Sequence, residues 1–269
     1  MFNKLIQRDV EARLGELDLE FNAYGYDPIG ISRDHLGAFY SLLQIFYRQY
    51  FRVECDGLQH IPAEGRAMII GNHSGSLPAD AGMVMASLFF DLNPPRYIHG
   101  MVEKFAQTLP FLSSWFSRIG QFTGLPEHAE RLLHDDRLLL AFPEGARGIG
   151  KLYKDRYKLV RFGTGFMRIA LKTKTPIVPF AYVGGEESFP AIYHSKSLAR
   201  LLGIPYWPVP PYLVPFPIPV QCRIHYGEPL YFEGDGTESD AIIEAYVHTV
   251  RARIAQLITE GRARMEGIR

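Results

Sequence analysis

The pattern of apolar positions over the first fifty residues predicts two helices. Apolar side chains recur at helical spacing over residues 2–20, and again over a stretch that Ser32 can cap and that runs to about Tyr50. The apolar stripe of the second helix is broad and aromatic, and it consists of Leu36, Phe39, Tyr40, Leu43, Phe46, Tyr47 and Tyr50. Such a helix either packs on a core or lies at a lipid surface, where tyrosine is favoured.

From residue 51 onward, short apolar runs alternate with helical patterns. This alternation predicts an α/β fold, in which a mostly parallel central sheet is flanked by helices. The predicted strands are 67–70, 138–142, 177–183 and 223–226. The predicted helices are 80–92, about 162–173, and a last one that follows a capping-box pattern at 237–240 and runs to about 265. We therefore divide the chain into an N-terminal helical segment, 1–50, and an α/β domain, 51–269.

Composition and charge exclude several classes of protein. An apolar content of 47% is enough for a sizeable core, which argues against a disordered chain. The chain has 29 basic and 29 acidic residues, so it lacks the positive charge of a general nucleic-acid binder. With only two cysteines, Cys55 and Cys222, neither a disulfide framework nor a cysteine-rich zinc site is expected.

No segment has the pattern of a membrane-spanning helix or of a signal peptide. The uncharged run long enough to cross a bilayer is 201–222, and its many prolines argue against a helix. The N-terminus has charges throughout and no apolar core of a signal peptide. We therefore expect a cytosolic chain that can still touch a membrane surface.

A glycine-containing segment follows each predicted strand. These segments are GNHSG after 67–70, PEGARG after 138–142, GGEE after 177–183 and GEPL after 223–226. In open α/β sheets the ligand crevice lies beyond the carboxyl ends of the strands. If the four strands are parallel neighbours, the four segments converge on one site, whereas an antiparallel strand among them would break this arrangement.

The segment GNHSGSLPAD, 71–80, carries the first candidate for chemistry. His73 leaves a buried strand into a glycine-rich turn, and Asp80 begins the next helix. A neutral imidazole can take a proton from an attacking hydroxyl, and a carboxylate on its other nitrogen fixes the tautomer. If the substrate brings its own hydroxyl, no enzyme nucleophile is needed. Taken alone, a histidine in a polar turn is more often structural than catalytic.

The segment AFPEGARG, 141–148, carries the second candidate. Glu144, Gly145 and Arg147 suit the binding of a polar or anionic head group, although a Glu144–Arg147 pair would equally well brace the turn. The overlapping GARGIGK matches the start of a P-loop, but Leu152 stands where the Ser or Thr that binds magnesium belongs. The G-x-S-x-G and H-E-x-x-H motifs are absent, which disfavours a serine hydrolase and a zincin.

Three blocks in this order carry a resemblance. NHSG…D, FPEGARG roughly seventy residues later, and PIVPFAYVGGEE about thirty after that are similar to the glycerolipid (lysophospholipid-type) acyltransferase superfamily. The similarity is greatest to its branch related to mono- and diacylglycerol acyltransferases, and it spans roughly 50–230. It implies transfer of a fatty acyl group from acyl-CoA or acyl carrier protein to a lipid hydroxyl.

The resemblance also implies roles for individual residues. His73 would be the general base and Asp80 the partner that orients it. The residues implied to bind substrate are Asn72, Ser74, Gly75, Glu144, Gly145 and Arg147, while 176–179 would line the pocket or support the donor. The implied mechanism needs no metal and no cofactor beyond the acyl-CoA or acyl carrier protein that serves as co-substrate.

The sequence departs from the family pattern in three places. Six residues separate His73 from Asp80 where the family has four, and Glu-Gly-Ala-Arg-Gly replaces Glu-Gly-Thr-Arg-Ser. The usual Gly-x-x-Phe-x-x-Arg segment survives as GQFTGLP, with Leu125 or Pro126 where arginine is expected. These departures favour a neutral or bulkier lipid alcohol over a glycerol-phosphate acceptor.

Two further segments bear on how substrates arrive. The stretch 201–220 is uncharged and rich in proline, and we expect it to form a stiff apolar loop that either packs on its own domain or dips into a membrane beside the site. The side chains implied in lipid access are Tyr206, Trp207, Tyr212 and Phe216. The segment 151–161 has five cations and one acid, and it would meet anionic lipid heads, the phosphates of CoA, or only solvent.

The sequence therefore predicts a peripheral acyltransferase on the cytoplasmic side of a membrane. Its expected partners are a lipid acceptor, an acyl donor and the membrane surface, with no nucleic acid, and the sequence gives no oligomeric state. Two alternatives stay open: a non-catalytic lipid-binding or tethering protein of the same fold, and a thioesterase or lipid hydrolase that uses water.

Overall fold

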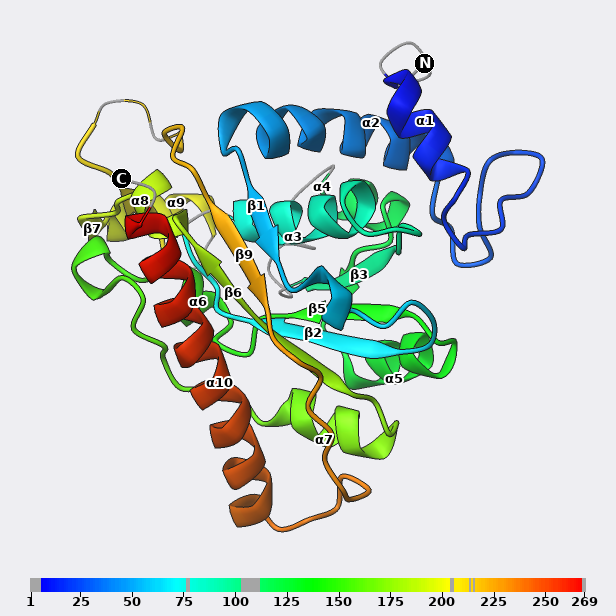
Figure 1. Cartoon of the computed structure of the whole chain (residues 1–269). Helices are drawn as coiled ribbons and strands as arrows, with labels where there is room; N and C mark the ends of the chain where they lie inside the picture. Colours follow the sequence, from blue (N-terminus) through cyan, green and yellow to red (C-terminus); the bar gives the residue numbers. More distant parts are fainter. Residues whose placement is uncertain are drawn as a thin grey trace.

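A seven-stranded sheet forms the centre of the computed structural model, which describes residues 6–75, 78–102, 112–203, 206–212, 214 and 216–267 (Figure 1). Its strands are β1 (Glu54–Asp56), β2 (Ala67–Gly71), β3 (Ile98–Val102), β4 (Phe122–Thr123), β5 (Leu138–Ala141), β6 (Ile177–Val183) and β9 (Arg223–Tyr226). They lie in the order β1-β9-β6-β2-β5-β3-β4. The predicted α/β fold with a mostly parallel sheet is confirmed.

Strand direction changes once across the sheet. Five strands, from β6 to β4 in the spatial order, are parallel, but β9 pairs antiparallel with β6 and β1 runs parallel to β9. The GEPL segment after β9 therefore lies at the opposite edge from the turns that follow β2, β5 and β6. The predicted convergence of all four segments is wrong for this one, because local apolar pattern carries no information about strand direction.

The reversal brings the beginning of β9 to the edge at which β6 ends, since Arg223 pairs with Val183. The beginning of β1 lies at the same edge, since Glu54 pairs with Arg223. The proline-rich segment before β9 and the helical segment before β1 therefore both reach the edge at which the GNHSG, PEGARG and GGEE turns lie.

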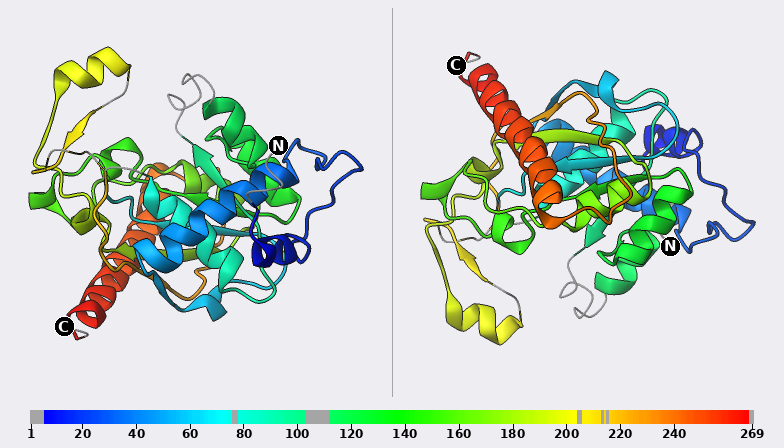
Figure 2. Two further views of the ribbon diagram at one scale, coloured as in Figure 1. Left: turned by 90° about the horizontal axis from the view of Figure 1, so that it is seen from above. Right: turned by 90° about the horizontal axis from the view of Figure 1, so that it is seen from below.

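Alternation along the strands divides the core into two layers. In β2, Ile69 faces a cluster that includes Tyr40 and Phe89, whereas Met68 and Ile70 face the cluster around α10. This is the period of two expected for a strand buried on both faces. The helices α2 (Arg33–Gln44) and α3 (Ala79–Phe90) cover one face, and α5 (Pro126–His134), α7 (Gly165–Lys172) and α10 (Asp240–Glu266) cover the other (Figure 2).

Shorter elements complete the described chain. These are α1 (Arg8–Leu14), α4 (Leu112–Arg118), α6 (Ala146–Ile149), α8 (Gly185–Ser188), α9 (Lys196–Leu202) and a small antiparallel pair, β7 (Tyr193–His194) with β8 (Pro208–Val209). The proline-rich segment thus contains one short strand within the predicted loop. Among the described residues, no helix combines the length and the apolar character needed to span a bilayer.

Both predicted N-terminal helices are present. The first, α1, is shorter than the predicted 2–20, of which residues 2–5 lie outside the described part. The oxygen of Ser32 accepts a hydrogen bond from the backbone of His35 and so caps α2, which continues as a π-helix, Ile45–Tyr50. Tyr40 stacks on Phe89 of α3 with ring centroids 3.8 Å apart, so the aromatic stripe packs on the core.

The last helix begins where the sequence predicts, but the hydrogen bonds at its start differ from the predicted capping box. The side chain of Ser239, the residue before α10, makes no capping hydrogen bond. Instead the carboxylate of Glu238 accepts from the backbone of Asp235 and Gly236, and so closes the loop that precedes the helix. The predicted capping box is therefore replaced by a carboxylate that caps a loop.

Candidate active site

The imidazole of His73 and the carboxylate of Asp80 are hydrogen-bonded to each other. The first residues after β2 carry His73, and the first turn of α3 carries Asp80, with 2.7 Å between Nδ1 and Oδ2. Because Nδ1 faces a carboxylate, we assign the proton to Nδ1, which leaves Nε2 as the acceptor. The longer spacing between the two residues thus still allows the pair to form.

Asp80 is held rigidly in this position. Its side chain is fully buried and accepts from the backbone N–H groups of Ser74 and Ala81, both at 2.8 Å. The imidazole of His73 also stacks on Phe142, with centroids 4.1 Å apart and planes 15° apart. With one edge bonded and one face covered, the ring has a single orientation, and 13% of its side chain stays exposed.

Asn72 attaches the turn that carries His73 to β6. Its side-chain amide donates to the carbonyl of Tyr182 at 3.0 Å and accepts from the same residue's N–H at 2.8 Å. The side chain thus makes the pair of hydrogen bonds that a neighbouring strand would make. Asn72 and Ser74 are buried, so both act on the geometry of the turn rather than at an open surface.

Glycines allow the three turns to approach one another. Gly75 has φ of +87°, and a Cβ there would lie 2.8 Å from the carbonyl oxygen of Gly185. Gly145 has φ of +57° at the beginning of α6, a conformation that glycine adopts without strain. A Cβ on Gly148 would lie 3.1 Å from the Cβ of His73. The turns after β2, β5 and β6 therefore form one packed unit.

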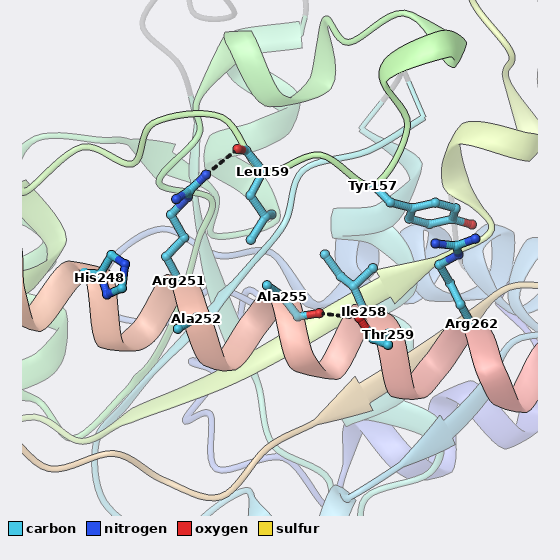
Figure 3. Close-up of a pocket in the computed structure, with 9 residues that line it drawn as sticks. All are labelled: Tyr157, Leu159, His248, Arg251, Ala252, Ala255, Ile258, Thr259 and Arg262. Atoms are coloured by element: carbon cyan, nitrogen blue, oxygen red, sulfur yellow. Dashed lines mark hydrogen bonds between the residues drawn. The ribbon is translucent and has the colours of Figure 1, made fainter.

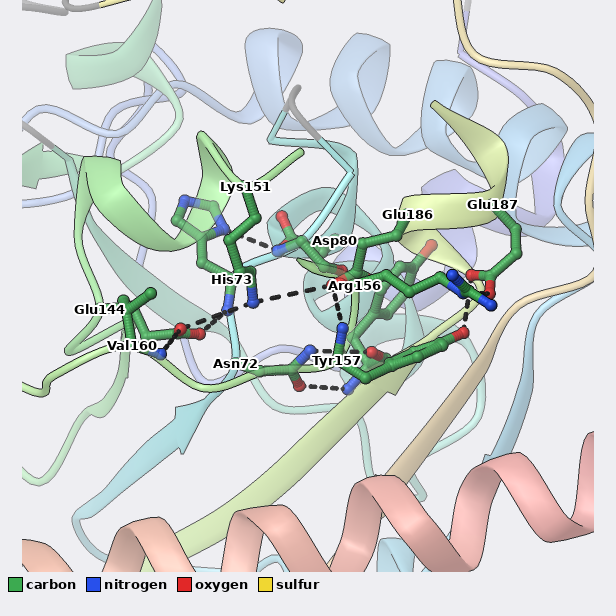
Figure 4. Close-up of polar contacts among 12 residues, drawn as sticks. Asn72, His73, Asp80, Glu144, Lys151, Arg156, Tyr157, Val160, Glu186 and Glu187 are labelled. Atoms are coloured by element: carbon green, nitrogen blue, oxygen red, sulfur yellow. Dashed lines mark hydrogen bonds and ion pairs between the residues drawn. The ribbon is translucent and has the colours of Figure 1, made fainter. Parts of the chain in front are cut away.

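Glu144 lies behind His73 and supports it through the backbone (Figure 4). Its fully buried carboxylate accepts from the N–H of His73 at 3.0 Å and from that of Val160 at 2.8 Å, and Lys151 lies 3.5 Å away. The partner of Glu144 is thus Lys151, not Arg147, which is exposed on α6. The sequence resemblance implies that Glu144 binds substrate, but in the structure its carboxylate supports the turn.

Two residues of this region were not predicted from the sequence. The ammonium of Lys151 lies 3.7 Å from the carboxylate of Glu186, and both side chains are only 4% exposed. Burial raises the pKa of Glu186 to about 7, against the opposing effect of Lys151. No sequence signal separates Lys151 from the other cations of its segment, because its burial depends on acids supplied by two other turns.

The basic segment 151–161 is largely neutralised by acids. Beyond Lys151, its cations form ion pairs with carboxylates of other elements or of its own turn, namely Arg156 with Glu187, Lys158 with Asp155 and Arg161 with Glu244. Four of the five predicted cations thus have an acidic partner. This matching reduces the positive charge that the segment can offer to phosphates.

An open cavity of about 290 Å³ lies between this segment and α10 (Figure 3). Its lining includes three basic side chains, those of His248, Arg251 and Arg262, and the apolar Leu159 and Ile258. It contains none of the site residues predicted from the sequence. Tyr157 forms part of its wall and donates from its hydroxyl to Glu187.

The predicted lipid-access side chains lie along the proline-rich segment. Phe216 is 48% exposed and packs edge-on against Tyr50, whose hydroxyl donates to the carbonyl of Pro217 at 2.6 Å. Tyr206 lies against Gly150 at the end of α6, where a Cβ would be 3.0 Å from its ring. The segment therefore connects the N-terminal helices to the turn that carries Glu144.

Trp207 and Tyr212 are half-buried. The carbonyl of Trp207 accepts from the N–H of Ser195, and the ring of Tyr212 packs edge-on against Phe189. The segment 176–179, by contrast, lies at the beginning of β6, and Ile177 and Val178 are fully buried in the sheet. Within the described ranges, no group of three His, Cys, Asp or Glu side chains could hold a metal ion.

Comparisons with known proteins find a family model and several relatives of this chain. A sequence model of the acyltransferase family matches residues 52–183. An uncharacterized protein of Mycobacterium tuberculosis is 36% identical over 222 residues, which cover 79% of this chain and 60% of that protein. A human protein named as a DGAT1/2-independent enzyme synthesizing storage lipids is 26% identical over 203 residues, which cover 75% of this chain and 60% of that protein.

A solved structure shares the fold. The 1-acyl-sn-glycerophosphate acyltransferase PlsC from Thermotoga maritima superposes with a TM-score of 0.56 and 16% identity, over 85% of this chain and 82% of that one. The sequence match over residues 52–183 and the shared fold support the acyltransferase superfamily. The chain spans about 60% of the length of the curated relatives described above.

Proposed function

We propose that this protein transfers a fatty acyl group from an acyl-CoA or acyl carrier protein thioester to the hydroxyl of a lipid, with His73 as general base. The observation that supports this most directly is the His73–Asp80 hydrogen bond of 2.7 Å at the edge where the three turns meet. The pair leaves Nε2 free to accept a proton, which is what attack by a substrate hydroxyl requires.

The proposed reaction has two steps. The lipid oxygen bonds to the thioester carbon while its proton moves to Nε2 of His73, which gives a tetrahedral oxyanion and an imidazolium paired with Asp80. The oxyanion then collapses, the carbon–sulfur bond breaks, and the imidazolium gives its proton to the departing thiolate. The products are an acylated lipid and a free thiol.

Stabilisation of the oxyanion requires hydrogen-bond donors that do not already donate within the protein. The N–H groups of His73 and Ser74 already donate to Glu144 and Asp80, so neither suits this purpose. Arg147 is exposed on α6, the helix that packs on His73, and we propose it as the residue that meets the oxyanion or the head group. We propose that Gly75 and Gly145 shape the part of the site around His73.

We further propose that the protein binds a membrane peripherally on its cytoplasmic side, through the segments that enter β1 and β9. Exposed apolar side chains occur on both segments, and they are Leu42, Ile45, Val214, Phe216 and Ile218. The two segments meet where Phe216 packs against Tyr50. Because both segments begin their strands at the edge that carries His73, a lipid surface bound there would present acceptor hydroxyls beside the site.

The catalytic proposal is tested with His73→Ala. Purified protein is incubated with labelled acyl-CoA or acyl carrier protein and mixed lipid acceptors, and acylated lipid is measured. We expect turnover to fall about 10²–10⁴-fold, the usual contribution of a general base, with lipid binding unchanged. The control is His134→Ala, an exposed histidine at the end of α5.

Other outcomes identify the alternatives. Near-normal acyl transfer by His73→Ala would refute the proposed base. Loss of acyl-CoA with release of free fatty acid and no acylated lipid would indicate a thioesterase. Failure of the wild-type protein with both donor types and all acceptors, with lipid binding intact, would indicate a tethering protein.

The membrane proposal is tested with a Val214→Ser and Phe216→Ser double variant. We expect sedimentation with lipid vesicles to weaken by about tenfold or more, because two side chains lose their transfer from water. Tyr24→Ser is the matched control, since Tyr24 is 88% exposed but lies on neither segment. Equal sedimentation of the double variant and the wild type would contradict this surface assignment.

A further inference from the structure

Three buried charged side chains form a cluster directly behind His73, one from each of three turns. Glu144 follows β5, Lys151 follows α6, and Glu186 lies in α8 after β6 (Figure 4). The ammonium of Lys151 lies between the two carboxylates, 3.5 Å from Glu144 and 3.7 Å from Glu186. None of the three side chains is more than 4% exposed.

The cluster depends on a single cation. In the described part of the chain, no basic group other than Lys151 lies within 4.0 Å of the carboxylate of Glu144 or Glu186. Oε1 of Glu186 accepts a long hydrogen bond of 3.4 Å from the N–H of Tyr157, and its Oε2 has no partner there. A buried carboxylate without a counter-charge lowers the free energy of unfolding by several kcal/mol, so Lys151 offsets the cost of burying the two acids.

This charge balance bears on the catalytic histidine through Glu144. The carboxylate of Glu144 holds two backbone N–H groups at once, those of His73 and Val160. If Glu144 were repelled by Glu186 or took up a proton, its hydrogen bonds to the backbone of His73 and Val160 would weaken. The turn that positions His73 would then be less well ordered.

We propose that Lys151 is a positioning residue for His73, which acts by balancing the charges of the buried Glu144 and Glu186. The inference rests on the proposed role of His73 as base. Its central claim is electrostatic: the contribution of Lys151 is its charge against a second acid, not the volume that its side chain fills.

The charged and titratable groups that face this region come from every element around it. They are Asp80 from α3, Glu144 from the turn after β5, Glu186 and Glu187 from α8, Tyr182 from β6, Cys222 before β9, and Lys151, Arg156 and Tyr157 from the segment after α6. Without the ammonium of Lys151, the carboxylates of Glu144 and Glu186 repel each other or take up a proton. The hydrogen bond from the backbone N–H of His73 to Glu144 is then weakened, so that amide loses protection from hydrogen exchange. Replacing Glu186 by glutamine removes one negative charge at nearly constant shape and should cancel this effect.

The experiment compares Lys151→Met, Glu186→Gln and the double variant with the wild type. Hydrogen exchange of the His73 backbone amide is followed by NMR, with its resonance assigned by its loss in His73→Ala. In Lys151→Met we expect this amide to exchange about tenfold faster or more. We also expect kcat to fall about tenfold or more with little change in KM, as a misaligned base requires.

The double variant separates charge balance from a structural role. Adding Glu186→Gln to Lys151→Met should return the exchange rate of the His73 amide to that of the wild type and restore most of kcat, although it adds a second core substitution. Lys158→Met is the control, since Lys158 is 72% exposed and its partner is Asp155. We expect this control to change neither quantity.

Three results would overturn the proposal. The first is an unchanged exchange rate of the His73 amide in folded Lys151→Met, and the second is a double variant no better than Lys151→Met. If Lys151→Met alone does not fold, the double variant decides, and its failure to fold as well is the third. Hydrogen exchange is measured without substrate, so it tests this inference even if no acyl transfer is found.

Discussion

Asp80→Asn is the substitution that tests the geometry of the site most sharply. The carboxylate accepts three hydrogen bonds, one oxygen from Nδ1 of His73 and the N–H of Ser74, and the other from the N–H of Ala81. An asparagine has one acceptor oxygen, so its NH₂ group must face a donor in either orientation. If the NH₂ faces Nδ1, the imidazole must carry its proton on Nε2, and it can no longer act as a base.

The magnitude follows from these contacts. If the oxygen stays on His73, the tautomer survives, but the imidazolium loses its counter-charge and the N–H of Ala81 faces a donor. One buried unsatisfied donor costs about 1–3 kcal/mol of stability. With either the tautomer or the counter-charge lost, we expect kcat to fall about 10²–10⁴-fold, which corresponds to about 2.7–5.5 kcal/mol in the barrier.

The assay is the initial rate of lipid acylation over a range of donor concentrations, with unfolding by urea measured in parallel. Asp91→Asn is the matched control, because Asp91 lies at the other end of α3 and accepts from Tyr47 and Arg48 instead of His73. It should lose stability and keep kcat. If Asp80→Asn keeps kcat within about tenfold of the wild type, Asp80 does not orient the base.

Three further perturbations have defined outcomes. Burial raises the pKa of Glu186 to about 7 from an ordinary value of 4.5, so this group destabilises the fold as the pH rises through this range. Glu186→Gln should therefore reduce the loss of unfolding free energy between about pH 5 and 8 by up to about 3 kcal/mol, measured by urea titration at each pH. Gly148→Ala places a Cβ 2.5 Å from that of Glu144 and should cost about 1–3 kcal/mol and most of the activity, whereas Gly163→Ala, with 3.8 Å to its nearest neighbour, should cost neither. Asn72→Ala leaves two buried backbone groups of β6 unpaired and should lower the free energy of unfolding by about 2–6 kcal/mol, and a loss below about 1 kcal/mol would contradict the pairing.

Local pattern predicted the elements whose apolar runs are continuous and bounded by breakers. The strands β6 and β9 begin and end where the sequence places them, and β2 is one residue longer than predicted. The strands β1, β3 and β4 were missed, because β1 is largely polar and β3 has His99 and Gly100 at its centre. These strands form through pairing with neighbours distant in the sequence, which no local window reveals.

The site was predictable to the extent that parallel strands gather the turns that follow them. The turns after β2, β5 and β6 meet as predicted, since these strands are parallel neighbours. The partner of Glu144 was not predictable. Lys151 lies seven residues from one of its acids and thirty-five from the other, and only the folded chain shows that the three side chains meet. The roles of His73 and of the residues around it, and the boundary at residue 50, stay predictions.

The reversed pair formed by β1 and β9 has a mechanical consequence. The chain enters both strands from the edge that holds the turns after β2, β5 and β6, and β9 bonds directly to β6, which ends at the glycines facing Ser74. A bilayer that held the two entering segments would restrain the ladder between β9 and β6. Attachment to a surface would thus reduce local opening of the strand that anchors Asn72, and hydrogen exchange in that ladder should slow when vesicles are added.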